Sequence, residues 1–103
     1  MLRWVLRRVH RVRIANASML PTLRHGQVVL VDYARLRRRA PRPGEVVLVR
    51  HPVSDLTVVK RVIRVDDDGV WVEGDNPPES EDSRHFGAVS PAACLGRVEC
   101  ILL

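Results

Sequence analysis

Short runs of Val, Leu and Ile, separated by turn-forming residues, dominate the chain and predict a mainly β protein. Six of these runs have the length and the β-branched content typical of strands. They cover residues 9–15, 27–33, 45–51, 56–66, 70–74 and 96–102. The intervening segments are rich in Pro, Gly, Asp and Asn, which favour turns. Asp68-Gly69 is typical of a hairpin turn, and Ser90-Pro91 is typical of the start of a short helix.

Length and composition indicate one small globular domain. The chain has 103 residues, of which 46% are hydrophobic and 28% charged, and these values exclude a disordered or low-complexity protein. Because only four residues are aromatic (Trp4, Tyr33, Trp71 and Phe86), we expect an aliphatic core in which Val dominates. We divide this domain into a basic N-terminal segment, 1–13, and a core, 14–103.

The positive charge is concentrated near the N-terminus. Residues 1–40 hold ten arginines and one acidic residue, whereas residues 41–103 hold seven basic and eleven acidic residues. One interpretation is a basic β-barrel that binds nucleic acid, but the chain lacks the interleaved aromatic residues that stack on bases. Leu2, Val5 and Leu6 follow helical spacing among arginines, which suits an anionic membrane surface. A short element that caps the domain is the interpretation we favour.

Lys60 is the single lysine among 17 basic residues. In the strand predicted over residues 56–66, its side chain shares a face with Val58 and Val62. Apolar surroundings lower the pKa of a lysine, and a neutral lysine can act as a general base, which an arginine cannot. The commoner fate of such a lysine is to extend its charged end into solvent.

Two further segments hold candidate chemistry. Ser18 follows a predicted strand and precedes a turn at Pro21, a position where a serine is either a turn former or a nucleophile supplied with a base. Residues 74–89 are dense in polar side chains, and their composition alone is typical of a solvated loop. The cysteines and histidines lack the spacing of a zinc site, so we expect no metal and no cofactor. We interpret Cys94 and Cys100 as small core residues in a reducing compartment, with a disulfide as the alternative.

Taken together, four segments resemble, in order, the motifs of type I signal peptidases, which are serine proteases with a Ser–Lys dyad. The resemblance covers residues 14–98. The four segments are Ser18-Met19-Leu20-Pro21-Thr22-Leu23, Arg42-Pro43-Gly44-Glu45-Val46-Val47, Lys60-Arg61-Val62-Ile63, and Gly74-Asp75-Asn76 followed by Ser80, Asp82-Ser83-Arg84, Gly87 and Val89.

The resemblance implies a small β-barrel-like catalytic core with one or two short helices, and it implies a role for each matching residue. Ser18 would be the nucleophile and Lys60 the general base. Ser83 would orient the Lys60 amine, and Asp82 and Arg84 would brace that loop as an ion pair. The backbone N–H of Ser18 and the side chain of Asn16 would hold the oxyanion. The substrate would lie against Ile14, Ala15, Met19, Tyr33, Val58 and Val59.

Two features resemble those of one bacterial branch of this family. They are a short Asp-rich turn after the lysine strand and the sequence Arg50-His51-Pro52. That branch comprises the maturation proteases of nickel-type superoxide dismutase, which remove an N-terminal leader from the dismutase precursor. General processing of exported proteins is the nearest alternative. An inactive adaptor is disfavoured by the complete Ser18–Lys60–Ser83 set, and a self-cleaving repressor by the lack of a preceding DNA-binding helix pair.

No apolar run approaches the roughly 18–20 residues that a membrane-spanning helix needs. We therefore expect a soluble cytoplasmic protein that touches a membrane at most peripherally, through its basic N-terminal segment.

Overall fold

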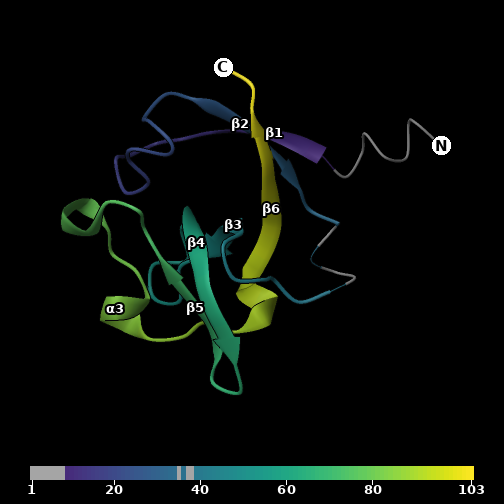
Figure 1. Ribbon diagram of the computed structural model, residues 1–103, viewed down its shortest axis with the longest axis vertical. Coiled ribbons are helices and arrows are strands. Elements are labelled where there is room, and N and C mark those ends of the chain that lie inside the picture. Colours follow the sequence, from purple (N-terminus) through teal and green to yellow (C-terminus); the bar gives the residue numbers. More distant parts are fainter. Residues whose placement is uncertain (1–8, 35, 37–38) are drawn as a thin grey trace.

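The computed structural model describes residues 9–34, 36 and 39–103, and in this part of the chain the mainly β prediction is confirmed (Figure 1). All six predicted strands are present, with ends within two residues of those expected. They are β1 (Val9–Arg13), β2 (Val28–Asp32), β3 (Val46–Arg50), β4 (Thr57–Asp66), β5 (Gly69–Glu73) and β6 (Cys94–Ile101). The predicted amphipathic segment falls largely on residues 1–8, outside the described residues.

The six strands form one antiparallel sheet in the order β1-β2-β6-β3-β4-β5. The last strand in sequence, β6, lies between β2 and β3 and joins the two halves of the sheet (Figure 1). Gly96 allows this arrangement, because a Cβ at that position would lie 2.7 Å from a methyl carbon of Val31 on β2. The sheet is open, with β1 and β5 at its edges.

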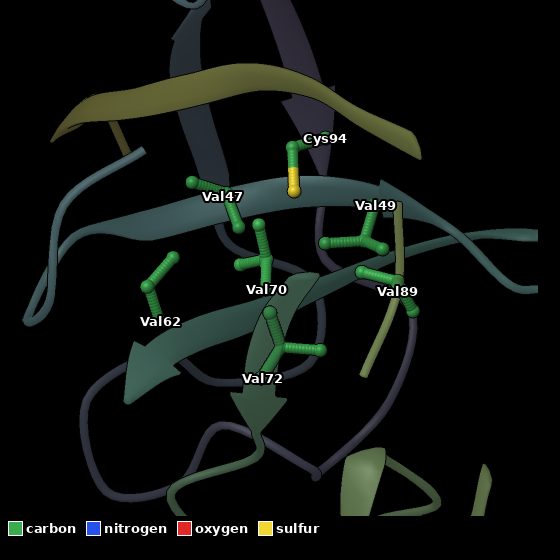
Figure 2. Packing of buried hydrophobic residues seen from close by; sticks show 7 residues of the cluster. All are labelled: Val47, Val49, Val62, Val70, Val72, Val89 and Cys94. Atoms are coloured by element: carbon green, nitrogen blue, oxygen red, sulfur yellow. The ribbon is translucent and has the colours of Figure 1, made fainter. Parts of the chain in front are cut away.

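The core is aliphatic and valine-rich, as predicted from the composition. Strand β3 is buried on both faces and therefore contributes to two clusters, since successive side chains point to opposite sides of a strand. Val47 and Val49 join the cluster shown in Figure 2, which also contains Val62, Val70, Val72, Val89 and Cys94. Leu48 points the other way and packs with Ile14, Met19, Leu23, Val29 and Val31.

Three short helical turns with defined bounds lie among the described residues. The helix predicted after Ser90 is the 3-10 turn η2 (Pro91–Ala93), and the Ser90 hydroxyl caps it by accepting a hydrogen bond from the Ala92 N–H at 3.2 Å. The other two, η1 (Pro77–Glu79) and α3 (Ser83–Phe86), lie in the segment whose composition is typical of a solvated loop. That expectation is wrong for Ser80, Asp82 and Ser83, which are buried because their polar groups bond one another and the backbone.

The cysteine prediction holds for one residue of the pair. Cys94 is buried in the valine cluster, and this burial raises the pKa of its thiol to about 11. Cys100 is exposed instead, because β6 extends beyond the core at its C-terminal end. Both thiols are free. Within the described residues, no helix has the length and apolar character needed to cross a bilayer.

Candidate active site

Ser18 lies in a turn within the segment that links β1 to β2, and the loop after β5 fixes this turn in place. The Asn76 side-chain amide donates to the Ala17 carbonyl at 3.0 Å, and the Asn76 backbone N–H donates to the Ser18 carbonyl at 2.9 Å. The Thr22 hydroxyl donates to Asp75 at 2.6 Å. Three residues of this turn are thus tied to a segment more than fifty positions away in the sequence.

Asp75 is itself held by the strand that carries the lysine. Its carboxylate accepts two hydrogen bonds from the Arg61 guanidinium, at 2.9 and 2.8 Å, and Arg61 also donates to the Gly44 carbonyl at 2.8 Å. The bond to Arg61 is the main reason that the pKa of Asp75 lies below its ordinary value. Since Arg61 follows Lys60 directly, this pair fixes the position of β4 relative to the Ser18 turn.

The Lys60 side chain is buried, with 3% of its surface exposed. Burial lowers the pKa of the Lys60 amine, and the negative charge of Asp82 only partly opposes this effect. The amine donates to the Ser80 hydroxyl oxygen at 3.0 Å. This environment favours the neutral amine, the form in which a lysine accepts a proton.

The structure gives Ser80 the hydrogen bond to Lys60 that the sequence analysis expected of Ser83. The Ser83 hydroxyl instead accepts a hydrogen bond from the Val72 N–H of β5 at 2.9 Å. The reason is the start of α3, where the Asp82 side chain caps the helix and Ser83 turns toward the sheet. Ser80 precedes this turn and faces the lysine.

Asp82 fixes the direction of the hydrogen bond between Ser80 and Lys60. The Ser80 hydroxyl donates its proton to Asp82 at 2.5 Å, so its oxygen is left to accept from the Lys60 amine. Asp82 is fully buried and also accepts from the Gly74 N–H and the Arg84 guanidinium, which gives the predicted Asp82–Arg84 ion pair. Burial opposes ionisation of Asp82, but these hydrogen bonds outweigh it and hold the pKa of its carboxyl well below the ordinary value.

Gly74 brings these segments into contact. A Cβ built at this position would lie 2.3 Å from the Ser80 hydroxyl oxygen and 2.6 Å from the Ser18 carbonyl oxygen. Any larger residue would push the Ser18 turn away from the loop that holds the lysine. No hydrogen bond joins Ser18 Oγ to Lys60 Nζ directly in the part of the chain that is described. Such bonds are often long in a free enzyme and tighten when substrate binds.

The predicted oxyanion pair is arranged differently from the expectation. Instead of pointing toward a common acceptor, the two groups bond each other, because the Ser18 N–H donates to Asn16 Oδ1 at 3.1 Å. A side-chain oxygen that accepts from the N–H two residues later is typical of asparagine in turns. Asn16 therefore acts here as an acceptor that shapes the turn.

A cavity of about 290 Å³ opens beside Ser18. All six residues predicted to contact substrate (Ile14, Ala15, Met19, Tyr33, Val58 and Val59) line it, together with Val12, Arg13, Asn16, Ser18, Leu48 and Thr57. Its walls are mainly aliphatic. Ser18 is 4% exposed, and its place in the cavity lining is what makes it accessible.

Two open strand edges flank this cavity. β1 lies at the end of the sheet and, among the strands that the structure describes, pairs only with β2. β4 pairs with β5 from Arg61 onward, whereas its first residues, beginning at Thr57, pair with β3 alone. Unpaired edges of this kind can accept an extended peptide as an additional strand.

Sequence reasoning missed several residues of this site, although the signal for them was present. Ser80, Asp75 and Asn76 all lie in the fourth resemblance motif, but only its Asp82-Ser83-Arg84 part was given roles. Thr22 lies in the first motif and Gly74 opens the fourth. Among the described residues, no cluster of His, Cys, Asp and Glu is arranged to hold a metal ion.

Comparison with known proteins places this geometry in a family. Residues 5–98 match the family model described as Peptidase S24-like. The chain is 32% identical to the mitochondrial ATP-independent inner membrane protease subunit 1a of Arabidopsis thaliana, over 92% of this chain and 69% of the relative. It is 29% identical to the mitochondrial inner membrane protease subunit 1 of Xenopus tropicalis and 31% identical to subunit 2 of Danio rerio.

These last two matches cover 82% and 87% of this chain but only 63% and 62% of the relatives, so the chain spans less than two thirds of their length. The family match nevertheless includes the Ser18 turn, the Lys60 strand and the loop after β5. The chain therefore belongs to the Peptidase S24-like family of signal peptidase-like proteases.

Proposed function

We propose that the protein is a serine endopeptidase that removes N-terminal leaders from precursor proteins, with Ser18 as nucleophile and Lys60 as general base. The observation that carries this proposal is the buried Lys60 amine, oriented by Ser80 and placed beside the turn that holds Ser18. The relatives are named as inner membrane proteases, which is consistent with cleavage of proteins delivered to a membrane.

In the first half of the reaction, the neutral Lys60 amine takes the proton from Ser18 Oγ as that oxygen attacks the scissile carbonyl carbon. The new C–O bond gives a tetrahedral oxyanion. When the C–N bond breaks, protonated Lys60 returns the proton to the leaving amine. The acyl group then remains bound to Ser18 as an ester.

In the second half, Lys60 takes a proton from water, the hydroxide attacks the ester, and Ser18 Oγ leaves with the proton that Lys60 returns. The Ser18 N–H is the natural donor to the oxyanion in both halves. Because this N–H bonds Asn16 Oδ1 in the free protein, the oxyanion would replace the Asn16 oxygen as its acceptor. The Asn16 side chain would then be free to turn its amide toward the same oxygen.

The two open edges support binding of the substrate as an extended strand. A peptide that lies between residues 14–17 and residues 57–59 would form main-chain hydrogen bonds with both segments, whatever its sequence. Every second side chain of the peptide would enter the apolar cavity. The small volume of the cavity favours small, uncharged side chains.

A narrower proposal concerns the natural substrate, a nickel-type superoxide dismutase precursor. Its support is the resemblance noted for Arg50-His51-Pro52 and for the short turn between β4 and β5. β4 ends at Asp66 and β5 begins at Gly69, so a tight hairpin joins them without an inserted domain. Processing of exported proteins in general remains the alternative substrate class.

The nucleic-acid alternative gains no support from the arginines beyond residue 40. Like Arg39, five of these six lie within 4 Å of a carboxylate and are neutralised within the protein: Arg50, Arg61, Arg64, Arg84 and Arg97. Membrane contact through the first eight residues lies outside what the structure describes.

A peptide library tests the proposed function. We expect cleavage after small residues, with alanine preferred just before the cut and two positions earlier, because those side chains enter the cavity. A charged side chain there would lose its water without gaining a partner. Cleavage is read by mass spectrometry of leader-type peptides incubated with the protein, and the Ser18→Ala variant serves as the blank.

Two outcomes of this library would count against the proposal in different ways. Cleavage that persists in Ser18→Ala would remove Ser18 from the reaction. Cleavage mainly after lysine, arginine or bulky aromatic residues would leave Ser18 in place but show that the cavity does not select the residue before the cut.

Ser80 and Ser83 offer a matched pair of variants. Ser80→Ala removes the acceptor that orients Lys60, so we expect kcat to fall about tenfold or more while KM changes little. Ser83→Ala leaves the buried Val72 N–H unpaired, so it should lower stability by about 1–3 kcal/mol without changing kcat. Steady-state kinetics and thermal unfolding of both variants measure the difference. An equal loss of kcat in the two variants would refute the assignment of Ser80.

A further inference from the structure

The active-site cavity has one charged residue among those that line it, Arg13. This arginine is exposed and lies at the end of β1, where its guanidinium donates to the Gly26 carbonyl at 2.9 Å. That bond uses one of the five N–H donors of the guanidinium and holds the group at the rim. The remaining donors are available to a ligand.

Two further arginines lie on the segments that hold Arg13. Arg11 shares a strand face with Arg13, because residues two apart in a strand point the same way, and Arg24 lies in the adjacent turn. Among the described residues, no carboxylate forms an ion pair with any of the three. By contrast, most arginines elsewhere in the described core have a carboxylate partner. Within the described part of the chain, the charge of these arginines therefore has no acidic partner.

The backbone of β1 places this charge beside the substrate's path. The Ile14 N–H donates to the Gln27 carbonyl and the Ile14 carbonyl accepts from the Gly26 N–H, so Ile14 directs its main-chain groups toward β2. Along an antiparallel pair these groups alternate in direction. Arg13 and Ala15 therefore direct theirs to the open edge, where the peptide would be added.

The same geometry indicates which residue of the substrate lies near Arg13. A peptide that enters the reaction at Ser18 and runs back along β1 reaches Arg13 after five residues of the protein. Extended strands advance by about 3.3 Å per residue, so the substrate side chain near Arg13 is about four to six residues before the cut.

We propose that Arg13, with Arg11 beside it, selects substrates that carry an aspartate or glutamate about four to six residues before the cleaved bond. This inference rests on the proposed function and adds a specificity-determining residue to it. A carboxylate can accept two parallel hydrogen bonds from a guanidinium, which favours it over other anionic or polar groups at this place. Because the pair is exposed, we expect a two- to fivefold preference in Kd, which weakens as salt is added.

Binding to the Ser18→Ala protein tests this proposal apart from catalysis. Fluorescent leader-type peptides carry Glu, Gln or Lys at the fourth, fifth or sixth position before an Ala cleavage site, and anisotropy gives Kd at low and high salt. We expect the Glu peptide to bind tightest at one of these positions and the Lys peptide weakest. Arg13→Gln should abolish this order, and Arg13→Glu should invert it. Arg42→Gln removes an exposed arginine that lines no part of the cavity, and it should leave the order unchanged.

Several results would overturn the proposal. One is an equal Kd for the Glu, Gln and Lys peptides, and another is a preference for the Glu peptide that survives in Arg13→Glu. The others are an effect of Arg42→Gln on Kd as large as that of Arg13→Gln, and no binding of any peptide. Cleavage of the same peptides by the unmodified protein distinguishes the two proposals. If the Glu peptide binds through Arg13 but no peptide is cut, the specificity site stands and the proposed peptidase activity fails.

Discussion

Replacing Lys60 with methionine will remove peptidase activity while the protein stays folded. Methionine has a similar length and no charge, so it fits the buried site without desolvating a cation. It cannot take a proton from Ser18, and loss of a general base typically slows a reaction by about 10²- to 10⁴-fold. Peptide cleavage followed by mass spectrometry measures the loss, and circular dichroism with thermal unfolding verifies the fold. Ser18→Ala supplies the background rate.

The pH dependence gives this prediction a second test. Only the neutral amine is a base, so kcat/KM should rise with pH through the pKa of Lys60. Burial places that pKa below the ordinary value of 10.5, and the rise should therefore have its midpoint below pH 10.5. Residual activity in Lys60→Met that keeps the same rise with pH would show that another group is the base.

Replacing Asp82 with alanine will give the largest loss of stability among single changes at the site, about 3–5 kcal/mol. The carboxylate is fully buried and accepts hydrogen bonds from Ser80, Gly74 and Arg84. Its removal leaves buried donors without an acceptor and frees the Ser80 proton, so the orientation of Lys60 is lost as well. Urea unfolding of Asp82→Ala gives the free energy of unfolding. Asp67→Asn, at the exposed hairpin turn, is the control and should change it by less than about 0.5 kcal/mol.

The stabilisation by Asp82 must also depend on pH in a defined direction. Its pKa in the folded protein lies below the ordinary value of 3.8, because hydrogen bonds outweigh the cost of burial. The carboxylate therefore contributes its full stabilisation above about pH 4 and loses it as the pH falls toward the depressed pKa of the folded state. We expect the stability difference between the unmodified protein and Asp82→Asn to shrink in that range. A difference that is constant from pH 6 to pH 2 would contradict the assignment.

The strands were predictable because each one is specified locally. Runs of valine bounded by Pro, Gly or Asp fix the position of a strand to within two residues, and β3 illustrates this with Val46–Arg50 between Gly44 and Pro52. The order of strands in the sheet was not predictable in the same way. It depends on the insertion of β6 between β2 and β3, which no local pattern indicates.

The loop after β5 shows where sequence reasoning fails. Ser80 and Ser83 are three residues apart in similar polar surroundings, and nothing in their composition tells which one faces the lysine. The choice is made by the Asp82 cap, which starts α3 and turns Ser83 toward Val72. Asn16 is a similar case, because an asparagine near a turn can either donate to a ligand or cap the turn with its oxygen.

The position of β6 also has a consequence during synthesis of the protein. The β1–β2 pair carries Ser18, the β3–β4–β5 meander carries Lys60 and leads to Ser80, and within the sheet the two meet only through β6, which leaves the ribosome last. A nascent chain that has produced Ser18 and Lys60 therefore still lacks the strand that joins the two halves of the sheet. We expect the sheet to close, and the candidate site to be complete, only after β6 has been inserted between β2 and β3.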